Sequence, residues 1–237
     1  MKRRLVLFDI DGTLLLSGGA GRRAILAALN DVAGIGVGTG TVDAVRFDGK
    51  TDPQIVVELF EAAGEPLGGP ERIDRVLDRY LQHLEADLGA NAHLATVMPG
   101  IHPLLDLLGA DPGVVVGLLT GNIVRGASIK LAAAGIAPGQ FRVGAYGSDH
   151  AVRAELPPIA AERAAPHFGR SPRGPEVVII GDTPADVTCG RSLGATAIGV
   201  ATGHYRTDDL AAAGAAYVFN DLADTERVRA AILGDPA

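Results

Sequence analysis

The chain has 237 residues, with 21 Lys or Arg against 28 Asp or Glu, which gives a net charge of −7 at neutral pH. Hydrophobic residues make up 47%, which excludes wholesale disorder and, with this length, predicts one or two domains. The acidic balance argues against a nucleic-acid partner, and the single cysteine, Cys189, excludes an internal disulfide or a cysteine-based zinc site. No apolar run approaches the ~18 residues of a membrane span, so we expect a soluble, cytoplasmic protein.

The first predicted element is a buried strand over residues 5–8, which ends in two acids, Asp9 and Asp11. Side chains two residues apart in an extended chain point the same way, so both carboxylates can reach one crevice. Two like charges this close are costly unless a cation or a proton compensates them. The pattern therefore indicates a ligand site at the strand end; the alternative is an acidic strand end that faces water.

Residues 16–95 contain no convincing strand but carry three helical patterns, over residues 22–32, 53–63 and 71–88. Asp52 followed by Pro53 predicts a helix with Asp52 as its N-cap. Glycine-rich joints flank the whole stretch. We therefore expect a helical cap domain of residues 16–95, inserted into a core domain made of residues 1–15 and 96–237.

Strands and helices alternate in the rest of the chain. Strands are predicted over residues 114–119, 177–180, 196–200 and, more weakly, 217–219, and helices over residues 101–108, 123–134, 158–167, 184–193 and 208–213. The alternation predicts an α/β core, namely a doubly wound parallel sheet of Rossmann-like type with helices on both faces.

Polar groups also follow the second and third of these strands. Thr120, Gly121 and Asn122 offer a hydroxyl and backbone N–H groups at a helix N-terminus, which favours an anion, although a threonine there is also an ordinary cap. Asp182 ends the third strand, and Asp186 lies in the first turn of the next helix, facing back to the same place. Ligands bind at the carboxyl ends of strands in such sheets, so we expect these groups to meet the acids of the first strand.

Four carboxylates beside a hydroxyl and backbone donors predict a site for a hard cation next to a site for an oxyanion. Oxygen-only ligation with open positions is typical of Mg²⁺, which binds through a few carboxylates and substrate phosphate. The chemistry that this arrangement favours is phosphoryl transfer, with a carboxylate nucleophile, a nearby acid/base and a cation that neutralises the phosphate.

These motifs resemble those of the haloacid dehalogenase-like hydrolase superfamily. The sequence DIDGT at residues 9–13, Thr120 and GDTPAD at residues 181–186 stand in the superfamily's order, with a helical insertion after the first motif. The insertion's position is similar to that in members with a helical cap, among them phosphoglycolate phosphatase-like enzymes. The resemblance spans essentially the whole chain and implies a Mg²⁺-dependent phosphatase that forms an aspartyl-phosphate.

The resemblance also implies a role for each motif residue. Asp9 would be the nucleophile, and Asp11 would protonate the leaving oxygen and then activate the hydrolytic water. Thr120 would hold the phosphoryl group together with the backbone amides of Gly121 and Asn122. The metal ligands that the resemblance implies are Asp9, Asp11 through its carbonyl, and Asp182, with Asp186 supporting the metal or its waters.

The family has a further cation, usually a lysine, between the threonine and the last acidic motif. Lys130 is the only lysine in that interval, but it lies ten residues after Thr120, and we expect it to be far from the crevice. Arg153 precedes a predicted helix at about the expected place, so we predict that it pairs with the nucleophile and phosphate. The alternative is an arginine on the surface.

The cap is expected to carry specificity for a small phosphate ester, bound by a monomer or a homodimer. Lys50, in a polar loop at residues 46–52, is the best candidate there to meet an anionic group of the substrate, although a lysine at a helix entry is often simply solvated. Cys189 is expected to be a small buried residue.

Two other functions fit the same motifs. A sugar phosphomutase shares all of them with a phosphatase, and the motifs do not separate the two. A non-catalytic small-molecule-binding protein could keep the scaffold; the presence of every acidic position argues against that reading, whereas the missing lysine argues for it. Asp11 favours phosphate esters as substrates, since dehalogenases and phosphonate hydrolases of the family lack an acid at this position.

Overall fold

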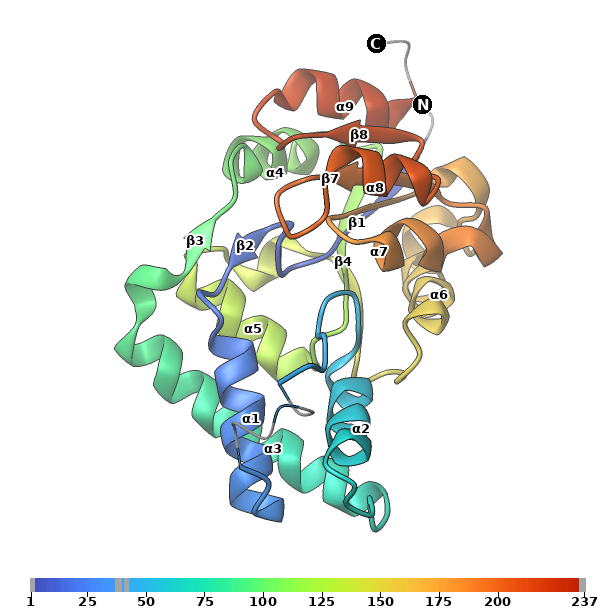
Figure 1. Cartoon of the computed structure of the whole chain (residues 1–237). Coiled ribbons are helices and arrows are strands. Elements are labelled where there is room, and N and C mark those ends of the chain that lie inside the picture. The colour runs from blue at the N-terminus through green and yellow to red at the C-terminus, as the bar shows by residue number, and fades with distance from the viewer. Residues whose placement is uncertain (1–2, 37–39, 41–42, 235–237) are drawn as a thin grey trace.

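The computed structural model describes residues 3–36, 40 and 43–234, and its centre is a six-stranded parallel sheet in the order β5-β4-β1-β6-β7-β8 (Figure 1). The strands are β1 (Arg4–Phe8), β4 (Val114–Thr120), β5 (Val143–Tyr146), β6 (Val177–Gly181), β7 (Thr196–Val200) and β8 (Tyr217–Phe219). The predicted doubly wound parallel sheet is thereby confirmed.

β1 lies in the middle of the sheet because it is apolar on both faces. All five of its residues are buried, as expected for a parallel strand covered from both sides. Phe8 stands level with Leu118 of β4 and with Ile180 of β6. The three strands therefore end at the same edge of the sheet, and the polar residues that follow them lie next to one another.

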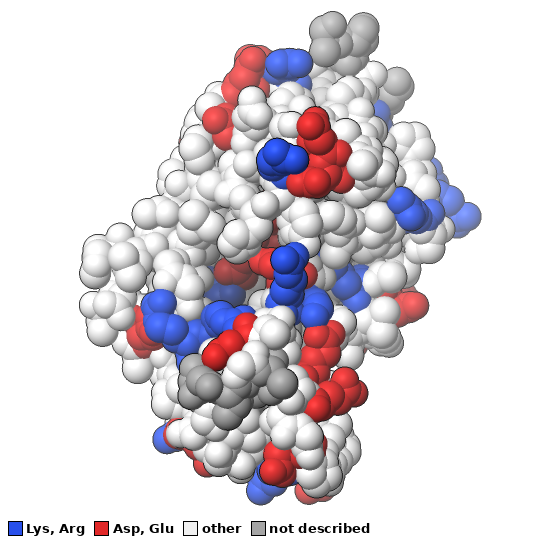
Figure 2. Space-filling model, viewed as in Figure 1, with Lys and Arg blue, Asp and Glu red and all other residues white. Residues whose placement is uncertain are grey.

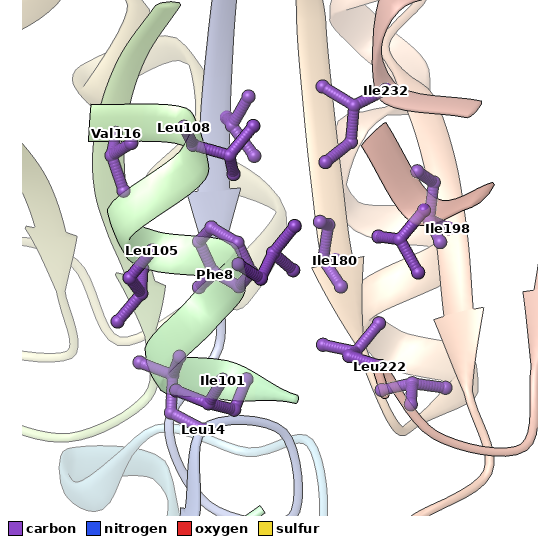
Figure 3. Packing of buried hydrophobic residues seen from close by; sticks show 14 of the residues in the cluster. Phe8, Leu14, Ile101, Leu105, Leu108, Val116, Ile180, Ile198, Leu222 and Ile232 are labelled. Carbon is purple, nitrogen blue, oxygen red and sulfur yellow. The ribbon is translucent and has the colours of Figure 1, made fainter. Parts of the chain in front are cut away.

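Helices cover both faces of the sheet. Side chains from α4 (Ile101–Gly109), α5 (Val124–Ala133) and α9 (Thr225–Leu233) pack with Val6 and Phe8 in one apolar cluster. Figure 3 shows Phe8 in this cluster between Leu105 of α4 and Ile180 of β6. Leu5 and Leu7 point the other way, toward α6 (Leu156–Phe168) and Cys189 at the end of α7 (Pro184–Cys189). Beyond them, α8 (Thr207–Ala212) packs on β7.

Three helices between β1 and β4 form a separate body at one end of the sheet (Figure 1). They are α1 (Ala20–Ala33), α2 (Asp52–Ala62) and α3 (Pro70–Ala90), and they share their own apolar cluster. A short antiparallel hairpin, β2 (Leu15–Leu16) with β3 (Thr96–Val97), carries the chain out of the core and back. The inserted helical cap is thus confirmed, and its predicted boundaries at 15/16 and 95/96 fall on this hairpin, although the boundaries stay a prediction.

The structure also corrects several predicted elements. β5 and α9 were not predicted, because β5 is a four-residue edge strand that contains glycine and α9 is a nine-residue helix in which only Val228, Ala231 and Ile232 are buried. The helix predicted over 184–193 ends at Cys189 and continues as a 3₁₀ turn over Gly190–Leu193. Further 3₁₀ turns cover Ala92–Leu94, Pro138–Gln140, Arg153–Glu155 and Gly174–Glu176.

The N-cap predicted for α2 is wrong by one residue. The cap is Thr51, whose Oγ1 accepts a hydrogen bond of 3.3 Å from the backbone N–H of Gln54, and Asp52 is the first helical residue. Thr51 is also a good capping residue, and the carboxylate of Asp52 is turned instead toward the core domain. Within the described residues, none of the helices combines the length and the apolar composition that a membrane crossing requires.

We expect Phe8→Ala to lower the free energy of unfolding by about 3–5 kcal/mol, because it empties a fully buried position where the strand, α4 and β6 meet. Urea denaturation followed by circular dichroism measures the loss. Val124→Ala, at a 45% exposed position, is the matched control and should change the free energy by less than about 0.5 kcal/mol. Equal effects of the two substitutions would contradict the packing described here.

Candidate active site

Three buried carboxylates meet at the carboxyl edge of the sheet. Oxygen atoms of Asp9, Asp182 and Asp186 all lie within 4.8 Å of one another. Asp9 and Asp182 directly follow β1 and β6, which are neighbours in the sheet. Asp186 is held in the first turn of α7 by a capping box, in which the Thr183 backbone N–H donates to Asp186 Oδ2 (3.1 Å) and the Asp186 N–H donates to Thr183 Oγ1 (3.2 Å).

The guanidinium group of Arg153 lies against two of these acids. Its Nη2 donates to Asp9 Oδ1 at 3.0 Å and also to Asp186 Oδ1, and the side chain is only 7% exposed. Burial opposes the charge of Arg153, but Asp186 and Asp9 outweigh burial and hold its pKa above the ordinary value. Sequence reasoning placed Arg153 beside Asp9, and the structure brings the two together.

The buried charges at this edge do not balance. With all three carboxylates ionised, one guanidinium would leave two negative charges in a space shielded from water. Burial, with contributions from Asp186 and Asp11, raises the pKa of Asp9 to about 7 despite the nearby Arg153. Burial, Asp186 and Asp9 likewise hold the pKa of Asp182 well above its usual range. A divalent cation bound by these oxygens would supply the missing positive charge.

The backbone around Asp182 is shaped to leave its carboxylate room. A Cβ atom on Gly12, where φ is +84°, would lie 2.4 Å from Asp182 Oδ2, and one on Gly203 would lie 1.8 Å from the same atom. Thr13 Oγ1 donates to Asp182 Oδ1 at 3.1 Å and fixes its orientation, a contact that sequence reasoning missed. The oxygen donors and this cradle fit a hard cation such as Mg²⁺.

Thr120 ends β4 beside this cluster and lines the same cavity. Its Oγ1 accepts hydrogen bonds from the side-chain amide of Asn122 (2.8 Å) and from the Asn122 backbone N–H (3.3 Å). The hydroxyl proton of Thr120 is therefore left to donate to a ligand. Gly121 lies in the same turn. Its carbonyl oxygen accepts a hydrogen bond of 2.7 Å from the backbone N–H of Asp52 in the cap.

The expectation that Lys130 lies far from the crevice is wrong. Its Nζ donates to Asp11 Oδ2 at 2.7 Å, and the residue is 5% exposed. Side chains in a helix point back toward the helix N-terminus. The long side chain of Lys130 therefore reaches Asp11, although Lys130 lies ten residues after Thr120. In the structure, Gly126, Ala127 and Lys130 share the buried face of α5, where a lysine needs a partner.

A cavity of about 500 Å³ lies between the sheet edge and the cap, and charged side chains surround the hollow (Figure 2). Lys50 lines it, but its ammonium pairs with Glu58 of α2, so a contact with substrate stays a prediction. Arg22 stacks on Phe47 and donates to backbone carbonyls of the same loop. Among the described residues, the buried hydroxyl of Tyr80, which also lines the cavity, has no hydrogen-bond partner.

The N-terminal end of α2 binds the cap to the core domain. Asp52 Oδ2 accepts a hydrogen bond of 2.9 Å from the backbone N–H of Ile123, and Thr51 Oγ1 donates to the carbonyl of Ala151 at 2.6 Å. A Cβ atom on Gly121 would lie 1.9 Å from the Lys50 carbonyl oxygen, so only glycine permits this approach. The cap and the core are therefore in backbone contact beside Thr120.

The burial of Asp52 predicts a pH-dependent stability. Burial raises its pKa to about 6, although Lys130 and the Ile123 N–H favour the ionised form. Protonated Asp52 is thus favoured in the folded state, so its contribution to stability is complete below pH ~4 and is lost as the pH rises through ~6. Relative to Asp52→Asn, the wild type should lose up to about 3 kcal/mol between pH 4 and pH 8.

Urea denaturation of both proteins across this pH range measures the difference. Asp78→Asn, at an exposed position of α3, is the control and should show no such trend relative to the wild type. A difference between the wild type and Asp52→Asn that stays constant with pH would contradict the raised pKa of Asp52.

Comparisons with known proteins agree with this fold. Residues 153–225 match the model of the family described as HAD-hydrolase-like. A search of curated proteins finds no match. A hydrolase from Pseudomonas syringae is 24% identical, with 98% of this chain and 99% of that chain covered and a TM-score of 0.71. A predicted phosphoglycolate phosphatase from Haemophilus somnus is 21% identical, with 97% and 99% covered and a TM-score of 0.70.

A third solved structure, CbbY from Rhodobacter sphaeroides in complex with phosphate, is 16% identical, with 94% of this chain and 96% of that chain covered and a TM-score of 0.72. The similarity in each case runs through the sheet and the helical insertion, since nearly the whole of both chains is covered. The resemblance indicated by the motifs is confirmed: the chain has the fold of the haloacid dehalogenase-like hydrolases with a helical cap, and its residues 153–225 match that family.

Proposed function

We propose that the protein is a Mg²⁺-dependent phosphatase that hydrolyses a small phosphorylated metabolite through an aspartyl-phosphate intermediate. The observation that carries the proposal is the buried carboxylate of Asp9, which lies beside a guanidinium group and two further carboxylates and lines the same cavity as Thr120. We place it with phosphoglycolate phosphatase-like enzymes, acting in the cytoplasm as a monomer or homodimer. The similar structure from Haemophilus somnus supports this class.

Asp9, Asp182 and Asp186 are the residues that would hold Mg²⁺, together with the backbone carbonyl of Asp11. Support comes from the two uncompensated charges of the cluster and from the cradle around Asp182. When bound, the ion supplies positive charge that neutralises the phosphate and favours attack by an anion.

In the first step, a carboxylate oxygen of Asp9 attacks the phosphorus atom. Arg153 holds Oδ1 of Asp9, and no donor among the described residues occupies its second oxygen. The new bond from Asp9 to phosphorus forms as the ester bond breaks, and the electron pair of that bond goes to the leaving oxygen. Asp11 gives its proton to this oxygen, so the alcohol departs neutral, while the Thr120 hydroxyl donates to a phosphoryl oxygen.

In the second step, the carboxylate of Asp11 takes a proton from a water molecule. The water oxygen attacks phosphorus as the bond from phosphorus to Asp9 breaks. Inorganic phosphate leaves, and both aspartates return to their starting state. Arg153 stays beside Asp9 throughout and offsets the negative charge that collects there.

We expect Asp9→Asn to abolish phosphate release from every ester that the wild type hydrolyses, with a loss of at least about 1000-fold in kcat, because the amide cannot form the intermediate. A panel of phosphate esters assayed with Mg²⁺ for free phosphate measures this. Arg153→Ala should also strongly lower the rate of phosphate release in the same assay.

Full activity of Asp9→Asn, or no phosphate release from any ester by the wild type, would contradict the proposal. A sugar phosphomutase would instead return an isomerised sugar phosphate with little free phosphate. A non-catalytic relative would bind an ester without converting it.

Mg²⁺ binding should be visible without any substrate. Titration with MgCl₂ should raise the thermal unfolding temperature of the wild type, because the ion binds only the folded site. Asp182→Asn removes one charged ligand and should strongly reduce the shift. Asp78→Asn, which removes an exposed charge far from the cluster, should keep the full shift. Equal shifts in the two variants would rule out the proposed metal ligands.

A further inference from the structure

We propose that Lys130 is a positioning residue of this phosphatase: with the side-chain amide of Asn122, its ammonium group fixes the carboxylate of Asp11 and reserves Oδ1 for the reacting oxygen atom. The inference rests on the proposed function, because it assumes that Asp11 is the acid and base. It adds a cation from α5 that the motifs of the sequence do not contain.

Both donors reach the same oxygen atom. Lys130 Nζ lies 2.7 Å and Asn122 Nδ2 lies 2.8 Å from Asp11 Oδ2. No side-chain or backbone donor of the described residues reaches Oδ1, and the Asp11 side chain is 41% exposed. Asp11 lines the cavity. One oxygen of the carboxylate is thus anchored, and the other is open to the place where a substrate would bind.

The nature of the two donors decides which oxygen can carry a proton. An ammonium group and an amide NH₂ donate hydrogen bonds and accept none. Oδ2 must therefore remain an acceptor in both contacts, and the proton of the carboxyl group is left on Oδ1. As the ester bond breaks, this proton passes from Oδ1 to the leaving oxygen; in the second step Oδ1 takes a proton back from water.

The cap holds the ammonium group of Lys130 in this position. A Cβ atom on Gly21, in the first turn of α1, would lie 3.1 Å from Lys130 Nζ, so the backbone of the cap closes one side. The charge of Lys130 also acts on the carboxylate of Asp52 at the start of α2. A buried ammonium group is costly unless it is paired, and its hydrogen-bonded partner is Asp11. The seated cap thus helps to hold Lys130 against Asp11.

The test compares two substrates of nearly the same shape, p-nitrophenyl phosphate and phenyl phosphate, with Mg²⁺ present. The p-nitrophenolate ion is a weak base that leaves without help, whereas phenolate is a stronger base that needs a proton from a well-placed acid. Lys130→Met keeps the length of the side chain and removes the donor. It should lower kcat/KM for phenyl phosphate about tenfold or more beyond its effect on p-nitrophenyl phosphate.

Lys50→Met is the matched control, because Lys50 also lines the cavity but pairs with Glu58. It should change kcat/KM for the two esters by the same factor. The ratio of the two kcat/KM values does not depend on the fraction of protein that is folded. If Lys130→Met yields no folded protein by circular dichroism, Lys130→Leu, which also lacks a donor, serves in its place.

An equal loss on both esters after replacement of Lys130, or no loss on either, would overturn the positioning role. Failure of the proposed function looks different. In that case the wild type releases phosphate from neither ester, or Asp9→Asn remains active, and the inference about Lys130 falls with it. A selective loss on phenyl phosphate, with Asp9→Asn inactive, supports both.

Discussion

Three buried carboxylates meet at the edge of the sheet beside one guanidinium group, which contacts two of them, and the organisation of the site follows from that imbalance of charge. Asp9, Asp182 and Asp186 are brought together because β1 and β6 are neighbours and because a capping box fixes the start of α7. Arg153 compensates one of the three charges. Burial of the remaining two disfavours their ionised state, and a dication bound between them would offset that cost.

The core of this fold could be predicted because its central strands are buried on both faces and therefore appear as continuous apolar runs, such as residues 5–8 and 177–180. β5 was not predicted because an edge strand of four residues carries only a short apolar run. α9 was not predicted because its short buried face is interrupted by charged residues. The capping residue of α2 was misplaced because Thr51 and Asp52 are both capable caps, and only the contact from Asp52 to Ile123 decides between them.

In the candidate site too, residues placed by the ends of the strands could be predicted, whereas contacts between segments far apart in the sequence could not. Residues at strand ends, such as Asp9, Thr120 and Asp182, could be assigned to one crevice because parallel strands end at one edge. Lys130 could not be assigned, since its contact with Asp11 depends on the direction of α5 and on a cap that closes over it. Lys50 was predicted from its loop, yet its ammonium pairs with Glu58, which lies eight residues further along the chain in α2. Contacts across the interface of cap and core depend on how two separate bodies fit, which residue spacing does not encode.

The proposed mechanism requires that Asp9 carries the phosphoryl group during turnover. Rapid acid quench of the enzyme with a phosphate ester and Mg²⁺, followed by peptide mass spectrometry, detects such an intermediate. We expect one added phosphoryl group on the peptide that contains Asp9, and none in Asp9→Asn. A phosphoryl group on another residue, or catalytic phosphate release by Asp9→Asn, would contradict it.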